Sequence, residues 1–278
     1  MHIGIFAKTF AGSDPRTVFA GVVGAGFRTT QYNMSCSGLA SMPDAIEMRI
    51  SADIRTAATE TGVEIAALSG TFNMIHPDQA VRSAGLRRLA VLAHAASTLG
   101  VDLITLCTGT RDPVDQWRAH PDNRTAEAWR DLLASIDAAV RIADEADVYL
   151  GIEPELANVV SSAEAARRLI DEIGSTRLKI VFDAANLFEV ASPAARREVV
   201  ARGLDLLADH IVMAHAKDRS ADGSFATAGT GVLDYRHYVT ELSRIGFDGA
   251  LVAHGLHARE APGVAAFLHR TISASAVA

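Results

Sequence analysis

The sequence predicts a closed (β/α)8 barrel of parallel strands. Short apolar, strand-like segments alternate eight times with longer segments of helical periodicity, and this alternation is typical of parallel α/β folds. The length of 278 residues is close to the ~250 residues typical of such a barrel. Four successive strand-like segments also end on an acidic residue or a histidine, at intervals of about one strand-and-helix unit. These observations favour a closed barrel over an open doubly wound sheet.

Each predicted strand is a short run of β-branched, aliphatic or aromatic residues. In chain order, the strands are expected at residues 2–7, 27–33, 63–68, 101–107, 148–153, 178–183, 210–215 and 248–254. The fifth strand is the clearest, because Pro154 ends it directly after Glu153. It delivers one carboxylate to the rim of the predicted barrel.

The predicted helices follow the strands and carry recognisable start and stop signals. They are expected at residues 15–25, 43–61, 77–99, 125–145 and 162–173, from residue 193 onward, and at residues 235–245 and 260–272. Asp14 before Pro15 and either Ser161 or Ser162 are suited to cap a helix start, and Gly62 is suited to end one. No linker or low-complexity stretch interrupts the chain, so we expect one barrel domain over residues 1–278.

Composition excludes several functional classes. A formal net charge of −7 and the absence of Lys/Arg runs argue against a nucleic-acid partner. No apolar run reaches the ~20 residues needed to span a membrane. The first ten residues are typical of a strand and not of a signal peptide, and the two cysteines, Cys36 and Cys107, are far apart. We therefore expect a cytoplasmic protein with reduced thiols.

The four strand-end side chains are Glu153, Asp183, His215 and His254. Carboxylates and imidazoles together form a mixed oxygen and nitrogen set that suits Mn2+, Mg2+ or Zn2+ and leaves positions for substrate oxygens. The competing interpretation is that each is an isolated polar group at a strand end. Their occurrence in consecutive units favours a divalent-metal site.

Five segments, GIEPE, VFDAAN, HIVMAHAKD, GTGVLDY and FDGALVAH, resemble the sugar phosphate isomerases/epimerases. These are xylose-isomerase-like TIM barrels that include the ketose 3-epimerases, and the resemblance spans about residues 1 to 271. It implies that Glu153, Asp183 and His215 bind a divalent metal, commonly Mn2+. The family has a glutamate at the end of the eighth strand, where this chain has His254.

The resemblance also implies a mechanism. In the two-base epimerases, glutamates of the fifth and eighth strands exchange a proton on opposite faces of a sugar carbon, while the metal stabilises an enediolate. Glu153 corresponds to one base, and His254 would serve as a ligand, as the second acid/base, or as both. A small carbohydrate substrate is implied, and a homodimer that pairs through loops near the mouth is compatible with the family.

Four further residues are candidates for substrate contact. Asn186 stands where the family has a second histidine and can hydrogen-bond a hydroxyl group. His76 follows the third strand and would contact substrate or metal, or else cap the next helix. Lys217 occupies a family position near the substrate, with a local salt bridge as the alternative. Trp117 would form part of the pocket wall.

These observations favour a metal-dependent isomerase or epimerase that acts on a sugar or a related polyhydroxylated carbonyl compound. A lyase or dehydratase acting on a hydroxy acid or cyclitol is the nearest alternative, because similar chemistry ends in elimination when a β-hydroxyl leaves. An abasic-DNA endonuclease is disfavoured by the acidic charge and by missing histidines, since Asn186 and the end of strand four supply none. A non-catalytic barrel subunit is the third possibility and is favoured by His254 alone.

Overall fold

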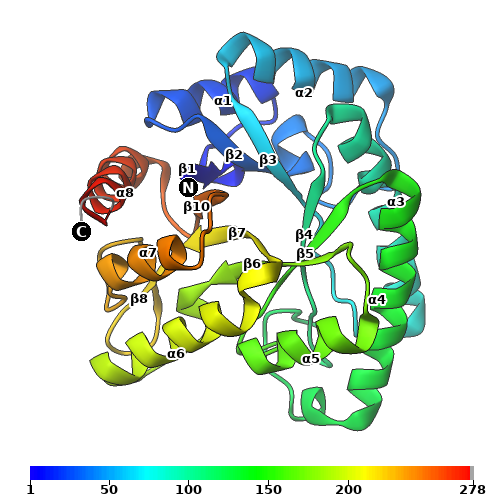
Figure 1. Ribbon diagram of the computed structural model, residues 1–278. Helices are drawn as coiled ribbons and strands as arrows, with labels where there is room; N and C mark the ends of the chain where they lie inside the picture. The colour runs from blue at the N-terminus through cyan, green and yellow to red at the C-terminus, as the bar shows by residue number, and fades with distance from the viewer. Residues whose placement is uncertain (276–278) are drawn as a thin grey trace.

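The computed structural model describes residues 1–275; residues 276–278 of the expected 1–278 domain lie outside the described part. The predicted barrel is confirmed. Eight parallel strands close into a ring in which β10 lies between β1 and β7 (Figure 1). The ring strands are β1 (His2–Phe6), β2 (Thr29–Tyr32), β3 (Glu64–Ser69), β4 (Leu103–Cys107), β5 (Tyr149–Glu153), β6 (Leu178–Asp183), β7 (Ile211–Ala216) and β10 (Ala250–Ala253).

In the described part of the chain, eight α-helices follow the strands and surround the ring (Figure 1). They are α1 (Pro15–Gly24), α2 (Met48–Thr61), α3 (Gln79–Leu99), α4 (Ala126–Ala146), α5 (Ala163–Ile173), α6 (Pro193–Leu207), α7 (Tyr235–Arg244) and α8 (Ala261–Ser275). Within residues 1–275, none of these helices combines the length and apolar character that a membrane crossing requires.

Local capping accounts for most helix boundaries. Asp14 accepts a hydrogen bond from the Thr17 amide at 2.9 Å, so the predicted cap of α1 is confirmed. Of the two serines proposed to cap α5, Ser162 does so. Gly62 ends α2 with φ of 68°, a left-handed conformation in which glycine carries no side-chain penalty.

The predicted start of α2 at Pro43 is wrong, because the helix begins at Met48. Asp44 lies close to the predicted start, but its carboxylate pairs with the Arg88 guanidinium of α3 at 2.7 Å. The intervening residues are not helical, and the extended Glu47 precedes the helix without a side-chain cap. Asp44 is therefore held by a tertiary ion pair ahead of the helix and does not form part of it.

Two layers of apolar side chains fill the molecule. The larger layer lies between strands and helices and contains fully buried aromatic residues such as Phe19, Tyr32 and Tyr238. A smaller cluster of Ala67, Leu103, Val181, Met213, Ala250 and Val252 is separate from it. Each fully buried residue of Leu or Val size contributes about 1.5–3 kcal/mol. Since the barrel interior of such folds is packed with side chains, polar groups gather at the carboxyl ends of the strands.

A small antiparallel hairpin, absent from the sequence prediction, follows β7. Its strands are β8 (Asp218–Arg219) and β9 (Phe225–Ala226), paired through Asp218 with Ala226 and Arg219 with Phe225. This hairpin lies on the carboxyl-end side of the barrel, because it directly continues β7. It places Phe225 beside the polar residues described next.

Candidate active site

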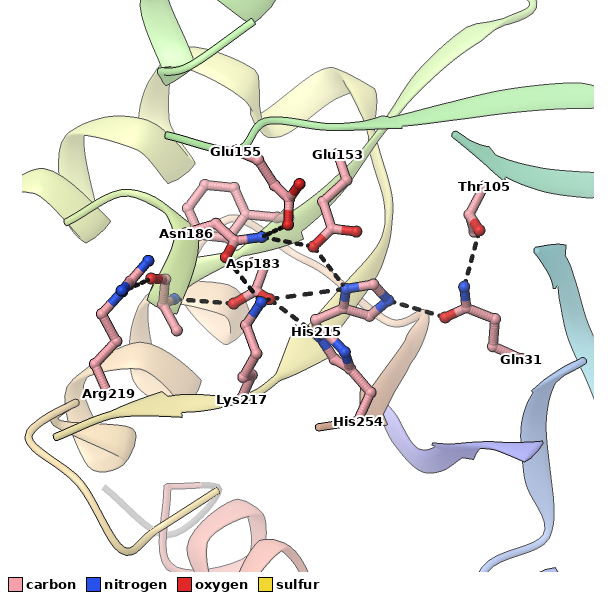
Figure 2. A network of polar contacts seen from close by, with 12 residues as sticks. Gln31, Thr105, Glu153, Glu155, Asp183, Asn186, His215, Lys217, Arg219 and His254 are labelled. Atoms are coloured by element: carbon pink, nitrogen blue, oxygen red, sulfur yellow. Dashed lines mark hydrogen bonds and ion pairs between the residues drawn. The ribbon is translucent and has the colours of Figure 1, made fainter. Parts of the chain in front are cut away.

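Four side chains that the sequence predicted as metal ligands converge at one end of the barrel (Figure 2). Glu153 ends β5, Asp183 ends β6, His215 lies in β7, and His254 follows β10. Asp183 and His215 are register partners on neighbouring strands, which brings their side chains together. One potential ligand atom from each of the four residues lies within 4.8 Å of the others. We call these four residues the ligand cluster.

Direct contacts hold the ligand cluster together. His215 Nδ1 lies 3.2 Å from Glu153 Oε1, and His254 Nε2 lies 3.1 Å from Asp183 Oδ2. The two imidazole rings are 4.3 Å apart between centroids. Asp183 Oδ1 also accepts the Ala185 amide hydrogen at 2.9 Å, which fixes the carboxylate against the backbone. The donors of the cluster therefore occupy defined positions.

Basic neighbours keep the buried carboxylates ionised. Asp183 is 1% exposed and Glu153 is 7% exposed. Burial alone raises the pKa of both groups, but Lys217 and the histidines outweigh it at Asp183, and His215 does so at Glu153, so both pKa values lie below their usual range. Lys217 Nζ lies 3.1 Å from Asp183 Oδ2. The site therefore presents two anionic oxygen donors near neutral pH.

The surroundings shift the pKa values of the two histidines in opposite directions. Burial, followed by the neighbouring His215, lowers the pKa of His254 to about 4. His254 is therefore neutral at pH 7 and can offer a nitrogen lone pair. Burial would also lower the pKa of His215, but the Glu153 carboxylate raises it above its usual value. A cation that displaces a proton from His215 would find a nitrogen already directed at the cluster.

This donor set fits a divalent cation. Two carboxylates supply two negative charges, and two imidazoles supply nitrogen donors without adding charge when neutral. Glu153, Asp183, His215 and His254 would hold the ion, consistent with the ligands predicted from the sequence. The donor types suit a Mn2+, Zn2+ or Mg2+ ion and do not distinguish among them.

Asn186 and Lys217 lie beside the ligand cluster (Figure 2). The Asn186 amide donates to Glu153 Oε1 at 2.8 Å and to Glu155 Oε1 at 3.3 Å, and its oxygen accepts from Lys217 Nζ at 2.8 Å. The ion pair of Lys217 with Asp183 is the local salt bridge that the sequence left open. Burial, followed by the charge of Glu153, raises the pKa of Glu155 to about 7.

A pocket of about 380 Å³ opens onto the cluster, which is within the ~300–1,000 Å³ range of small-molecule sites. Its lining includes Glu153, His215 and His254 together with Phe6, Lys8 and Gln31. Trp117, predicted as a wall residue, does line this pocket and is 51% exposed. A pocket of this size and polarity suits a small polar molecule.

His76 was expected to contact substrate or metal, or else to cap the next helix. His76 lines a neighbouring hollow, and both of its ring nitrogens have partners. Nδ1 accepts the Asp78 amide hydrogen at 3.0 Å, and Nε2 lies 3.2 Å from the Pro113 carbonyl oxygen. The ring therefore ties the start of α3 to the β4–α4 connection, close to the capping alternative.

Three residues near the site were not identified from the sequence. Gln31 of β2 contacts His215 Nε2 at 2.9 Å, and Thr105 of β4 contacts Gln31 at 2.8 Å. Phe225 of the β8–β9 hairpin covers Lys217, with Nζ 4.0 Å from the ring centroid. Polar residues near the ends of buried strands were the available signal for Gln31 and Thr105. No sequence signal placed Phe225 there.

Comparisons with known proteins agree with this architecture. The 3-keto-D-glucoside 4-epimerase of E. coli shares 16% identity over 97% of this chain and 99% of its own, with a TM-score of 0.75. A D-tagatose 3-epimerase-like protein shares 16% identity over 99% and 98%, with a TM-score of 0.78. The mannonate dehydratase of Streptococcus suis shares 15% over 99% and 93%, with a TM-score of 0.75. At these identities the likeness shows a common fold.

Curated proteins include no match to the chain. The family model described as xylose isomerase-like TIM barrel matches residues 19–268, a span from α1 into α8. This match covers most of the described barrel and confirms the resemblance seen in the strand-end motifs. The chain belongs to the xylose isomerase-like TIM barrel family.

Proposed function

We propose that the protein is a divalent-metal-dependent isomerase or epimerase that acts on a sugar or a related polyhydroxylated carbonyl compound. The observation that carries the proposal is the convergence of two carboxylates and two imidazoles within 4.8 Å beside a small polar pocket. Relatives of the same fold include a 3-keto-D-glucoside 4-epimerase and a D-tagatose 3-epimerase-like protein, and they support a carbohydrate substrate. We expect the enzyme to work in the cytoplasm.

Mn2+ is the cation we propose first, with Mg2+ and Zn2+ as alternatives, held by the ligand cluster. When bound there, such a cation would polarise a substrate carbonyl and so make the neighbouring carbon more acidic. We also propose substrate contacts for Trp117, which lines the pocket, and for Lys217 and Asn186, which are buried beside the ligand cluster and hydrogen-bonded to each other. These contacts would orient the carbon that loses its proton.

Glu153 is the proposed base. Its Oε1 is engaged by Asn186 and His215. Within residues 1–275, no hydrogen bond reaches Oε2, so this oxygen can take a substrate proton while Oε1 remains fixed. Removing a proton next to a carbonyl with a positioned carboxylate is worth typically 10²–10⁴-fold in rate. A carboxylate can thus be fixed through one oxygen and transfer a proton with the other.

His254 cannot divide its roles in the same way. The two nitrogens of an imidazole point in divergent directions, so one that binds the cation turns the other away from the same substrate atom. His254 Nε2 faces Asp183 within the ligand cluster. We therefore assign His254 as a ligand and leave proton transfer to Glu153. This differs from the two-base mechanism implied by the family resemblance.

A site with one base favours a second candidate function, dehydration of a hydroxy acid. In elimination one carboxylate can take the proton next to the carboxyl group and, once protonated, return that proton to the departing β-hydroxyl, which leaves as water; two-face epimerisation requires an acid/base on each side of the carbon. The mannonate dehydratase of the same fold supports this candidate. Isomerisation that returns the proton to the same face remains compatible with Glu153 alone.

Solvent-exchange measurements distinguish these functions. The Mn2+-loaded protein is incubated in D2O with D-tagatose, D-fructose or D-mannonate and followed by NMR. We expect deuterium at the carbon next to the carbonyl of a ketose, and its loss in Glu153→Gln. Glu198→Gln, on the exposed face of α6, is the control for the substitution itself. Loss of water from D-mannonate would instead assign the dehydratase reaction.

A non-catalytic barrel gives a different pattern. In that case the parent and Glu153→Gln would bind the same sugar with equal affinity, and neither would exchange deuterium or form product. This result would contradict the proposed enzyme. Exchange that persists unchanged in Glu153→Gln would contradict the assignment of the base while leaving the enzyme in place.

A further inference from the structure

A chain of buried polar contacts extends from the ligand cluster across the barrel (Figure 2). His215 Nε2 lies 2.9 Å from Gln31 Oε1, and Gln31 Nε2 donates to Thr105 Oγ1 at 2.8 Å. The three residues come from β7, β2 and β4 and are 2%, 5% and 3% exposed, respectively. Strands far apart in sequence are thus joined by side chains at the site.

The direction of these hydrogen bonds determines which ring nitrogen of His215 carries a proton. Thr105 receives the amide N–H of Gln31, so the amide oxygen of Gln31 faces the ring. A carbonyl oxygen only accepts, and His215 Nε2 must therefore carry a hydrogen. Nδ1 faces the Glu153 carboxylate, which also only accepts, so Nδ1 carries a hydrogen as well until a cation displaces it. The lone pair left on Nδ1 would then be directed at the cation. Nδ1 lies 3.2 Å from Glu153 Oε1 and 3.9 Å from Asp183 Oδ2, inside the ligand cluster.

We propose that Gln31 and Thr105 are positioning residues that hold His215 in the tautomer and ring orientation in which Nδ1 can bind the cation. The metal-binding part of this inference rests on the proposed function, whereas the assignment of a hydrogen to His215 Nε2 rests on the contacts of Gln31 with His215 and Thr105. Outer partners of this kind typically change metal affinity by 10–100-fold when removed. Gln31 acts here through His215, although it also lines the pocket.

Three substitutions separate this role from simple packing. Gln31→Leu keeps most of the side-chain volume but removes the acceptor for His215 Nε2. Gln31→Glu keeps an acceptor, and the Thr105 hydroxyl can rotate to donate to it. Thr105→Val removes the group that orients the Gln31 amide. Thr30→Val is the control, because Thr30 is buried on the same strand and donates to the Ile5 carbonyl at 2.6 Å, away from His215.

Two readouts are needed. Long-range ¹H–¹⁵N spectra of histidine-labelled, metal-free protein report which nitrogen of His215 carries hydrogen. Mn2+ competition with a fluorescent chelator reports metal affinity. We expect Nε2–H in the parent, Gln31→Glu and Thr30→Val. In Gln31→Leu the neutral ring should carry its hydrogen on Nδ1, facing Glu153, and Mn2+ affinity should fall 10–100-fold. Thr105→Val should lower affinity by less than Gln31→Leu.

The outcomes that overturn the inference differ from those that overturn the proposed function. Unchanged Nε2 protonation and unchanged Mn2+ affinity in Gln31→Leu would refute the positioning role. Equal losses in Gln31→Glu and Gln31→Leu would also refute it, because an acceptor would then be irrelevant. A parent that binds no Mn2+ would refute the metal-dependent function, while the tautomer spectra would still decide whether Gln31 orients His215.

Discussion

Asp218 lies outside the ligand cluster, yet it organises the loop that follows the β8–β9 hairpin. Its side chain is 1% exposed and accepts four backbone hydrogen bonds. Oδ1 accepts from the amides of Arg219 and Leu233, at 2.8 and 2.9 Å. Oδ2 accepts from the amides of Gly229 and Gly231, at 3.2 and 3.0 Å. One carboxylate thereby fixes the connection between β9 and α7.

Replacing Asp218 with Asn should be costly because an amide cannot reproduce this pattern. The Asn carbonyl can accept two of the four hydrogen bonds, while the NH2 group meets two N–H donors. At about 1.5 kcal/mol for each lost bond to a charged acceptor, the expected destabilisation is about 3 kcal/mol. For a chain of this size, that corresponds to a fall in Tm of roughly 6–12 °C.

Thermal and urea unfolding of the parent, Asp218→Asn and Asp222→Asn test this reasoning. Asp222 lies in the same hairpin, is exposed, and accepts from Ser224 through Oδ1 alone, at 3.0 Å from the amide and 2.7 Å from the hydroxyl. An Asn can keep both contacts, so Asp222→Asn should change stability by less than about 0.5 kcal/mol. If the two variants unfold at the same temperature, the four-bond account of Asp218 is refuted.

Two further predictions concern the metal and the loop. Metal analysis of protein purified without chelator should find about one equivalent of Mn2+ or Zn2+ in the parent but little in Asp183→Asn. The control Asp209→Asn lies at the opposite end of the barrel and should keep its metal. Equal metal content in all three proteins would place the ion elsewhere. Gly231→Ala should destabilise the protein by about 1–3 kcal/mol, because an added Cβ would lie 2.1 Å from the Arg219 carbonyl oxygen. Gly263→Ala, where a Cβ meets nothing within 4 Å, should be neutral or stabilising. If Gly231→Ala and Gly263→Ala lose the same unfolding free energy, the steric explanation is excluded.

The barrel and the ligand cluster were predictable from the sequence because both depend on patterns that repeat along the chain. Each of Glu153, Asp183 and His215 ends or nearly ends an apolar run, and parallel strands bring such ends to one side. The strand boundaries agree closely with those expected. Local capping could also be predicted at Asp14 and at the pair of serines that includes Ser162, because the side chains of Asp14 and Ser162 each accept a hydrogen bond from an amide three residues along the chain.

The remaining features depend on contacts between distant residues. Gln31 meets His215 across 184 positions, which becomes evident only when the order of strands in the ring is known. The two-residue strands of the β8–β9 hairpin are too short for any periodicity. His76 had two possible roles in the sequence, and its ring contacts both the Asp78 amide at the start of α3 and the Pro113 carbonyl on another loop. In each case tertiary geometry determines the role of the side chain.

The charge balance of the site explains how His254 fits at a position where the family resemblance implies a glutamate. Each buried carboxylate already has a basic neighbour, with Lys217 Nζ 3.1 Å from Asp183 and His215 Nδ1 3.2 Å from Glu153. A third carboxylate at position 254 would need a partner of its own, because an unpaired buried charge is strongly destabilising. Neutral His254 contacts Asp183 without adding charge. With His254, the site keeps two negative charges for a divalent cation but lacks a second carboxylate that could bind the cation through one oxygen and move a proton with the other. The histidine should therefore alter the reaction more than the metal affinity.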